Sequence, residues 1–280
     1  MKTVLVNKPI HPDALERLRQ EVDVLTPYQA GQEAFSELLP NLEGVIVCSA
    51  VTVGGEEMDR AERLEVIGRH GAGLDIVDVV AATQRGLPVV FTPYGPTEST
   101  AEHTLLLILA CARRLIQLDR AMRNGAFDIR DHLRGKELQG ASLGIVGFGR
   151  IGRRVAQMCQ AALDMSIYVF DPYVDSATIV ELGATPVHDV VELACMVDVL
   201  SAHVPLTDQT RHLIDRDVIH ALGADGILVN ASRGAVVDEA ALIEALKAGA
   251  LGSAGLDVFD PEPPAVDNPL LEMDQVVLSP

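Results

Sequence analysis

Residues 143–152 read Leu143-Gly144-Ile145-Val146-Gly147-Phe148-Gly149-Arg150-Ile151-Gly152. An amphipathic segment, Arg153 to Leu163, follows, and a second apolar segment, Ile167 to Phe170, then ends on Asp171. In such a unit the first glycine permits a tight turn, the second lets backbone approach a pyrophosphate, and the third lets the helix pack on the strand. The pattern predicts a strand–turn–helix unit that binds a dinucleotide.

Asp171 indicates which dinucleotide is bound. An acidic side chain at the tip of the second strand accepts both hydroxyls of an adenosine ribose and repels a 2′-phosphate. The N-terminus of the intervening helix supplies unpaired N–H groups to the phosphates. Glycines also mark ordinary turns and close packing, so the flanking strands, the helix and Asp171 carry the argument. We predict NAD as the cofactor, in preference to NADP.

The bulk composition fits a two-domain α/β protein. The glycine turn begins at residue 147 of 280, which leaves room for a separate domain ahead of it. Apolar residues make up 48% of the chain and aromatic residues 4%, so we expect an aliphatic interior. The net charge of −18 argues against nucleic acid and anionic membranes as partners, because both attract basic proteins.

The cysteines and the apolar runs predict a cytoplasmic protein without a metal site. Cys48, Cys111, Cys159 and Cys195 form no CxxC pair and no zinc pattern, which favours reduced thiols. The first residues run into a strand without the features of a signal peptide. The longest apolar run, Thr104 to Ala112, is too short to span a bilayer.

Strand and helix patterns alternate in the first hundred residues, which implies parallel strands with helices on both faces. We expect strands at Thr3–Asn7, Val22–Leu25, Gly44–Cys48, Leu64–Gly68 and Pro88–Phe91. We expect helices at Pro12–Gln20, Ala34–Leu39 and Ile76–Gln84.

A second series of the same kind begins at Ser142. We expect strands at Leu143–Gly147, Ile167–Phe170, Val199–Ala202, Ile227–Asn230, Gly255–Val258 and Val276–Leu278. We expect helices at Arg150–Leu163, Val190–Met196 and Glu239–Ala248. Between the two series, Thr97–Asn124 has the pattern of one long helix that crosses from the first domain to the second.

Three charged residues follow strands of the second series. Arg233 comes just after the strand Ile227–Asn230, and Asp257 and Glu262 lie at and after the end of the next strand. Open α/β sheets bind ligands at the carboxyl ends of their strands. Each of these residues, taken alone, could be an ordinary solvated surface charge. Their shared position at the carboxyl edge of the sheet is what favours a functional role.

Together these segments resemble the D-isomer-specific 2-hydroxyacid dehydrogenase family over essentially the whole chain. The resemblance also includes Arg69-His70-Gly71-Ala72-Gly73-Leu74-Asp75, Ser99-Thr100-Ala101-Glu102-His103-Thr104, Gly135-Lys136-Glu137-Leu138 and His203-Val204-Pro205-Leu206-Thr207. It implies two Rossmann-like or flavodoxin-like domains with parallel sheets, joined by a long crossover helix. Residues 1–98 would bind substrate and residues 99–280 would bind NAD.

The resemblance implies a role for each matching residue. Arg233 would bind the carboxylate and carbonyl of the substrate, and its planar fork suits two oxygens. The N–H groups of Ala72 and Gly73 would hold the carboxylate from the other side, with Arg69 and His70 beside them. The implied cofactor contacts are Thr104, Gly147, Gly149, Arg150, Ile151, Gly152, Asp171, Pro172, His203, Val204, Pro205, Thr210, Ala231, Ser232 and Asp257. No metal is implied.

Glu262 would stabilise the imidazolium form of a histidine that gives a proton to the substrate oxygen. In the family that histidine directly follows a strand ending in Ser-Pro, whereas this sequence stops at Ser279-Pro280. Among other histidines, His70 lies in the substrate loop, and neither His103 nor His203 occupies the expected place. We therefore interpret the chain as truncated before its proton donor.

The substrate expected from the resemblance is a small D-2-hydroxy or 2-keto acid. Phosphoglycerate dehydrogenases place an arginine after the third strand, where this chain reads Val47 to Thr52 without a basic residue. Arg69 matches another basic position of that subgroup, so D-3-phosphoglycerate remains the alternative. A catalytically weak NAD-responsive binding protein is a second alternative. The family also implies a homodimer formed through the NAD-binding domain.

We expect the 280-residue chain to bind NAD but to reduce 2-keto acids with NADH slowly, because general acid catalysis contributes about 10²–10⁴-fold. NADH oxidation under saturating keto acid measures this rate. Rapid turnover by these 280 residues would show that the proton donor is a group other than the expected histidine.

Overall fold

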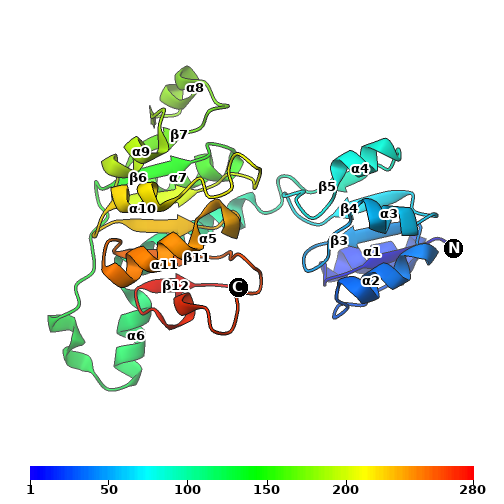
Figure 1. The fold of residues 1–280 in the computed structure, drawn as a ribbon, viewed down its shortest axis with the longest axis horizontal. Helices are drawn as coiled ribbons and strands as arrows, with labels where there is room; N and C mark the ends of the chain where they lie inside the picture. Colours follow the sequence, from blue (N-terminus) through cyan, green and yellow to red (C-terminus); the bar gives the residue numbers. More distant parts are fainter. The chain divides into compact units, whose positions relative to one another are not determined.

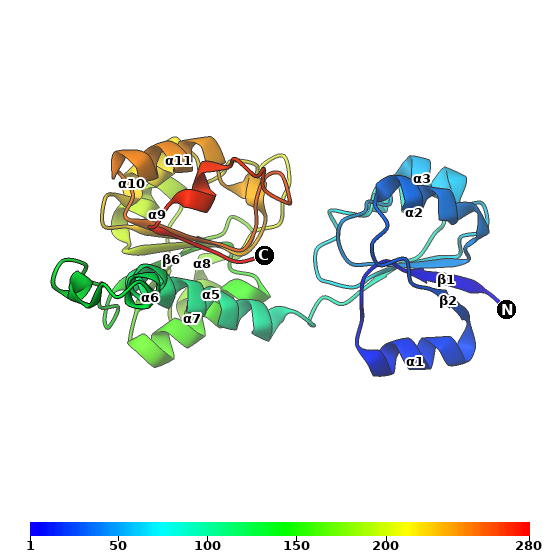
Figure 2. The ribbon, with the colours of Figure 1, turned by 90° about the horizontal axis from the view of Figure 1, so that it is seen from below.

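The computed structural model describes residues 1–280 and divides into two compact units, Met1–Pro96 and Thr97–Pro280. Each unit is a parallel sheet with helices on both faces (Figures 1 and 2), as the alternating sequence pattern predicts. The division falls between Pro96 and Thr97, two residues before the boundary after residue 98 that the sequence predicts. No helix is long and apolar enough to cross a membrane.

The first unit contains a five-stranded sheet in the order β2-β1-β3-β4-β5. Its strands are β1 Thr3–Val6, β2 Asp23–Leu25, β3 Gly44–Val47, β4 Val66–Arg69 and β5 Val89–Phe91. Its helices are α1 Pro12–Glu21, α2 Gln32–Leu38, α3 Gly55–Arg60 and α4 Val79–Gln84, with a 3₁₀ turn at Leu39–Asn41. In Figure 2, α1 lies on one face of the sheet, and α2 and α3 lie on the other.

The core of the first unit lies on the face that α2 and α3 cover. Leu5, Phe35, Leu39 and Val47 are fully buried there, whereas α1 buries no residue completely. Helix α3 is absent from the sequence prediction because six residues are too few to show helical periodicity. The Glu57 side chain accepts a hydrogen bond from Gly54 N at 3.0 Å and so helps to begin this helix.

The second unit contains a seven-stranded parallel sheet in the order β12-β11-β10-β9-β6-β7-β8. Its strands are β6 Ser142–Val146, β7 Ser166–Phe170, β8 Thr185–Pro186, β9 Val199–Ala202, β10 Ile227–Asn230, β11 Ser253–Leu256 and β12 Val276–Leu278. Its helices are α5 Thr97–Ala112, α6 Leu115–Arg123, α7 Arg150–Leu163, α8 Ser176–Glu181, α9 Val190–Met196, α10 Arg216–Leu222 and α11 Glu239–Ala248. Three short 3₁₀ helices occur at Phe127–Asp131, Gly234–Val236 and Pro269–Glu272.

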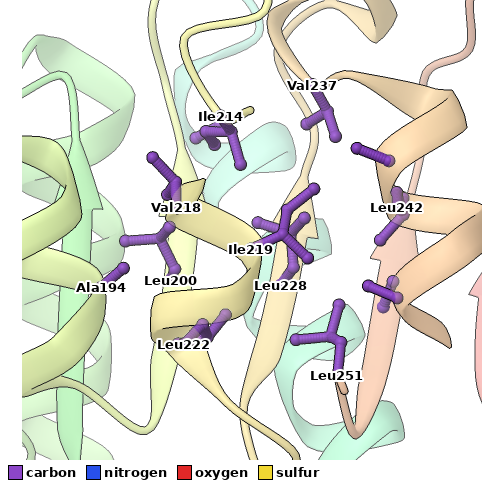
Figure 3. Close-up of a cluster of buried hydrophobic side chains, with 14 of the residues drawn as sticks. Ala194, Leu200, Ile214, Val218, Ile219, Leu222, Leu228, Val237, Leu242 and Leu251 are labelled. Carbon is purple, nitrogen blue, oxygen red and sulfur yellow. The ribbon is translucent and has the colours of Figure 1, made fainter. Parts of the chain in front are cut away.

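The strand order reverses at β6, which pairs with β7 on one side and with β9 on the other. Such a reversal opens a crevice at the carboxyl ends of the strands, where doubly wound sheets bind ligands. One face of the sheet is covered by α9, α10 and α11. Figure 3 shows the aliphatic cluster between these helices and the sheet, including Leu200, Leu228 and Leu242.

Helices α5 and α7 cover the opposite face (Figure 2). Gly255 on β11 lets α5 lie close to the sheet, because a Cβ at this position would be 3.0 Å from the Leu107 Cβ and 3.2 Å from the Cys111 Sγ. Leu107, Ile108 and Cys111 are all buried in this contact.

The prediction of a single long helix at Thr97–Asn124 is wrong. The structure has two helices, α5 and α6, separated by Arg114 in a left-handed conformation with φ of 52°. The break is enforced by distant residues: Lys136 N donates to Ala112 O at 2.7 Å, and the Arg114 Nη1 donates to Gly252 O at 3.1 Å. Neither glycine nor proline occurs at the break, so the helical pattern of the sequence continues through it.

The predicted strand Gly255–Val258 is shifted by two residues. Strand β11 is Ser253–Leu256, because its pairing with β10 joins Ser253 to Ile227 and Leu256 to Asn230. Asp257 is therefore the first residue after the strand rather than a residue within it. Helices α8 and α10 and strand β8 are also absent from the prediction, since each is short.

Replacing Leu228 by Ala should lower the free energy of unfolding by about 2–5 kcal/mol, because the side chain has 0% exposure in the central strand β10. Val180→Ala on α8 is the matched control, since Val180 is 60% exposed and should change stability by less than about 0.5 kcal/mol. Urea denaturation measures both. Equal losses would contradict this placement of the core.

Candidate functional site

The glycine turn after β6 is shaped by backbone contacts that exclude side chains. Gly147 has a φ of +95°, and a Cβ on it would lie 2.7 Å from the Val204 Cγ1 and 2.8 Å from His203 O. A Cβ on Gly152 would lie 2.2 Å from Gly147 O. By contrast, no atom lies within 4 Å of the Cβ position of Gly149. The first and third glycines therefore close the turn, and the second leaves its surface open.

Helix α7 begins directly after this turn with no side-chain cap at Gly149. The Arg153 N donates to Gly149 O at 3.0 Å. The N–H groups of Arg150, Ile151 and Gly152 precede this bond and belong to the first turn of the helix. An uncapped helix N-terminus beside an open glycine surface suits a phosphate group.

Asp171, just after β7, is held by two backbone amides. Its Oδ2 accepts from Phe148 N at 2.7 Å and its Oδ1 from Tyr173 N at 2.8 Å. The carboxylate thus ties the loop after β7 to the glycine turn after β6 at the carboxyl edge of the sheet.

A cavity of about 260 Å³ lies beside Asp171. Eight of the residues that line it are sequence-predicted cofactor contacts: Gly147, Gly149, Asp171, Pro172, His203, Val204, Pro205 and Thr210. Five other lining residues are not among the contacts predicted from the sequence: Phe170, Tyr173, Thr207, Gln209 and Leu213. Tyr173 follows Asp171-Pro172 and could have been inferred from proximity, whereas Gln209 reaches the cavity only because its loop folds back toward Tyr173. The Tyr173 hydroxyl donates to the Gln209 Oε1 at 2.8 Å.

The loop after β9 is held by its own hydroxyl groups. Thr207 N donates to the Thr210 Oγ1 at 2.8 Å, and the Thr210 Oγ1 donates to Pro205 O at 2.6 Å. These bonds fix the cavity wall formed by Pro205 and Thr210.

His203 at the start of this loop is a neutral residue at pH 7. Although the residue keeps some exposed surface, burial of its ring lowers the pKa of His203 to about 4. Its Nε2 lies 2.9 Å from the Oγ of the buried Ser201. The ring therefore brings no positive charge to the cavity.

The loop after β10 is organised by Asn230, which is 1% exposed. Its Oδ1 accepts from Ser232 N at 3.0 Å and from the Ser232 Oγ at 2.8 Å, and its Nδ2 donates to Arg233 O at 2.8 Å. Asn230 thus fixes the backbone of the predicted residues Ala231, Ser232 and Arg233. This role of Asn230 is not predicted from the sequence, although Asn230 belongs to the same run.

The loops after β10 and β11 pack directly on each other. A Cβ on Gly234 would lie 1.9 Å from Phe259 O, so only glycine fits there. The Oε1 of the nearby Glu262 accepts from Phe259 N at 3.0 Å. The loops that carry Arg233 and Glu262 are therefore brought together at the carboxyl edge of one sheet.

Two other predicted cofactor contacts lie near α5. Asp257 bonds to Ser279 and His103, whereas Thr104 is fully buried and donates its hydroxyl to Thr100 O at 2.8 Å. The structure therefore places Asp257 at a partly exposed edge and encloses Thr104 beneath the surface.

In the first unit, the loop after β4 is organised by Arg69. Its Nε donates to Gly73 O at 2.7 Å, and its Nη1 donates to Cys48 O at 2.6 Å and also to His70 O. The guanidinium is thus turned into its own loop. The N–H groups of Ala72 and Gly73 donate to no carbonyl in the structure.

A sequence model described as D-isomer specific 2-hydroxyacid dehydrogenase, NAD binding domain, matches residues 105–280. The chain belongs to this dehydrogenase family. The resemblance stated from the sequence is thereby confirmed.

Individual relatives agree with this family. D-3-phosphoglycerate dehydrogenase of Archaeoglobus fulgidus is 42% identical over 99% of this chain and 52% of its own length. Hydroxypyruvate reductase of Thermotoga maritima is 36% identical over 99% of this chain and 90% of its own length. The crystal structure of the TT0316 protein from Thermus thermophilus has a TM-score of 0.91 at 36% identity, covering 99% of this chain and 88% of that protein. The chain spans about half the length of the phosphoglycerate dehydrogenases that it matches.

The second unit fits NAD, the cofactor of this family's NAD-binding domain, on structural grounds. Gly147 and Gly152 close a turn that a side chain would fill, and α7 presents its uncapped N-terminus beside Gly149. The carboxylate of Asp171 lies at the tip of β7, as a ribose contact requires.

Asp171→Ser should weaken NAD binding about 10-fold or more and narrow the preference for NAD over NADP, because a hydrogen bond to a charged group contributes about 1.5–3 kcal/mol. Asp128→Ser is the control, since it makes the same charge change on an exposed turn. Calorimetric titration with both dinucleotides tests the effect. An unchanged preference would show that Asp171 does not contact the ribose.

The lowered pKa of His203 predicts that the stability of the folded protein depends on pH. Its folded-state pKa of about 4 lies below the ordinary 6.5, so the unfolded state binds the extra proton first. Stability should not depend on this group above pH 6.5 and should decrease as the pH falls from 6.5 toward 4. His203→Gln should therefore lose less stability than the wild type between pH 7 and about 4.5, measured by urea denaturation. His220→Gln on the exposed side of α10 should behave like the wild type.

Proposed function

We propose that the protein is an oxidoreductase that transfers hydride between NAD(H) and a small D-2-hydroxy or 2-keto acid. The observation that carries this proposal is the arrangement of the second unit. One sheet edge carries the glycine turn, Asp171, and the packed loops of Arg233 and Glu262. A dinucleotide site and a carboxylate-binding arginine on one edge suit hydride transfer to or from a hydroxy acid.

We assign the cofactor to the cavity beside Asp171 and to the open surface at Gly149. The N–H groups of Arg150 and Ile151 would bind the pyrophosphate, and Val204, Pro205 and Thr210 would flank the adenosine half. Ala231, Ser232 and Asp257 would lie toward the nicotinamide half, across the strand-order reversal. When bound, NAD accepts the hydride from the hydroxy acid, and NADH returns it to the keto acid.

Arg233 is assigned to the substrate carboxylate and carbonyl oxygen. The guanidinium presents donors in a planar fork and polarises the carbonyl carbon while orienting it. Asn230 supports this role, because it holds the Arg233 carbonyl and so fixes the backbone from which the side chain extends. In the first unit, we assign carboxylate binding to the N–H groups of Ala72 and Gly73, with His70 beside them.

Glu262 is assigned to a proton-transfer pair. Its carboxylate would stabilise the imidazolium form of a histidine, which gives a proton to the substrate oxygen in reduction and accepts it in oxidation. The hydrogen bond from Phe259 N orients the Glu262 carboxylate for this role.

An unphosphorylated substrate is favoured by the first unit. Three donated hydrogen bonds turn the Arg69 guanidinium into its own loop, which leaves only part of its donor set for a phosphate. The segment Val47 to Thr52 supplies no basic residue. D-3-phosphoglycerate remains the second candidate, because several relatives carry the name of that dehydrogenase.

We infer a homodimer formed through the NAD-binding domain. The second unit exposes large apolar side chains on α5, on α6 and on the turn after α6, which fits burial against a second copy. They are Leu106, Leu115, Ile116, Met122 and Phe127. We also infer a cytoplasmic location, because all four cysteines are free thiols.

Arg233→Lys should lower kcat/KM for 2-keto acids about 100-fold or more, with the Kd of NADH changed less than about 3-fold, because lysine cannot bind two oxygens in a plane. Arg113→Lys, at an exposed position, is the control. Single-turnover reduction of glyoxylate, hydroxypyruvate and the phosphorylated three-carbon keto acid separates the candidate substrates. NADH binding with no detectable single turnover of any keto acid, even at the slow rate expected of this chain, would instead favour an NAD-responsive binding protein.

A further inference from the structure

Three residues from distant parts of the chain form a hydrogen-bonded network at the carboxyl edge of the second sheet. They are His103 on α5, Asp257 after β11 and Ser279 after β12. The Ser279 Oγ donates to the Asp257 Oδ1 at 2.6 Å, and the His103 Nε2 lies 2.7 Å from the Ser279 Oγ and 3.1 Å from the Asp257 Oδ1. None of the proposed steps of the reaction uses His103 or Ser279.

The direction of each hydrogen bond follows from the donors available. The Ser279 hydroxyl gives its proton to Asp257, so it can only accept from His103. The His103 Nε2 must then carry a proton, which also lies near the Asp257 Oδ1. Ser279 thus donates to Oδ1, and the His103 Nε2 lies 3.1 Å from the same oxygen, whereas Oδ2 has no hydrogen-bond partner in the structure. The carboxylate is fixed through one oxygen and keeps the other as an acceptor.

The backbone of Asp257 is fixed as well, because its N–H donates to Asn230 O at 3.0 Å. Its side chain is 29% exposed, so a ligand can reach it. Asp257 lies across β6 from Asp171, in the half of the sheet formed by β9, β10 and β11. A dinucleotide whose adenosine half lies at β7 extends its nicotinamide half toward that side.

We propose that His103 and Ser279 are positioning residues, which hold Asp257 so that its Oδ2 accepts a hydrogen bond from the carboxamide NH₂ of the nicotinamide ring. The inference rests on the proposed dinucleotide site. His103 and Ser279 lie outside the proposed cofactor surface, and they orient Asp257, which lies on that surface. The carboxamide is the suitable partner because its NH₂ is a donor, whereas the carboxylate only accepts.

The experiment compares three ligands by calorimetric titration of the 280-residue chain. NAD⁺ carries the carboxamide, ADP-ribose lacks the nicotinamide ring, and 3-acetylpyridine adenine dinucleotide replaces the NH₂ by a methyl group. His103→Leu and Ser279→Ala should each weaken NAD⁺ about 5- to 10-fold, the effect of one misplaced hydrogen bond. Binding of ADP-ribose and of the acetylpyridine analogue should change less than about 2-fold.

His103→Gln is the conservative variant, because its amide nitrogen can take the place of Nε2, and it should restore most of the NAD⁺ affinity. His220→Leu is the matched control, since this histidine is exposed on α10 and should affect no ligand. Thermal unfolding of each variant separates altered binding from lost stability.

Two outcomes would overturn this inference without overturning the proposed function. Equal weakening of NAD⁺ and ADP-ribose would show that the network only connects α5 to β12, and unchanged NAD⁺ binding by both variants would show that Asp257 needs no support. A wild-type chain that binds neither NAD⁺ nor ADP-ribose would instead overturn the proposed function itself.

Discussion

The contact of Gly152 with the Gly147 carbonyl is the constraint on which the site depends. A Cβ at Gly152 would lie 2.2 Å from that oxygen, so α7 approaches the end of β6 at backbone distance. This approach places the first-turn N–H groups of α7 beside the open surface of Gly149. The contact lies at the end of β6, the strand at which the strand order reverses. The proposed pyrophosphate site depends on this contact.

The loops around this turn are fixed mainly by hydrogen bonds between side chains and backbone. Asp171 holds the amides of Phe148 and Tyr173, and Asn230 holds the turn that leads to Arg233. Such bonds connect loops that have no regular structure of their own, and buried groups such as Asn230 strongly favour one geometry because losing a partner is costly. The carboxyl edge is therefore preorganised before a ligand binds.

Electrostatics favours the proposed reliance of the substrate end on one arginine. The chain has a net charge of −18, so its overall field repels anions. In the second unit, His203 is neutral at pH 7, because burial lowers its pKa to about 4. In the first unit, Arg69 binds its own loop. Under the proposed function, a carboxylate substrate would thus depend on local donors such as Arg233.

The sequence by itself determined the two parallel α/β units, the glycine turn and the charged residues at the strand ends, because these features depend on local periodicity and on glycine conformation. The tertiary structure alone decided the break at Arg114, the inward turn of the Arg69 guanidinium, and the approach of Gln209 to Tyr173. It also brought His103 and Ser279 to Asp257, across 176 residues between the histidine and the serine. Each of these depends on contacts between segments far apart in the chain, and such contacts leave no periodic signal in the sequence that makes them.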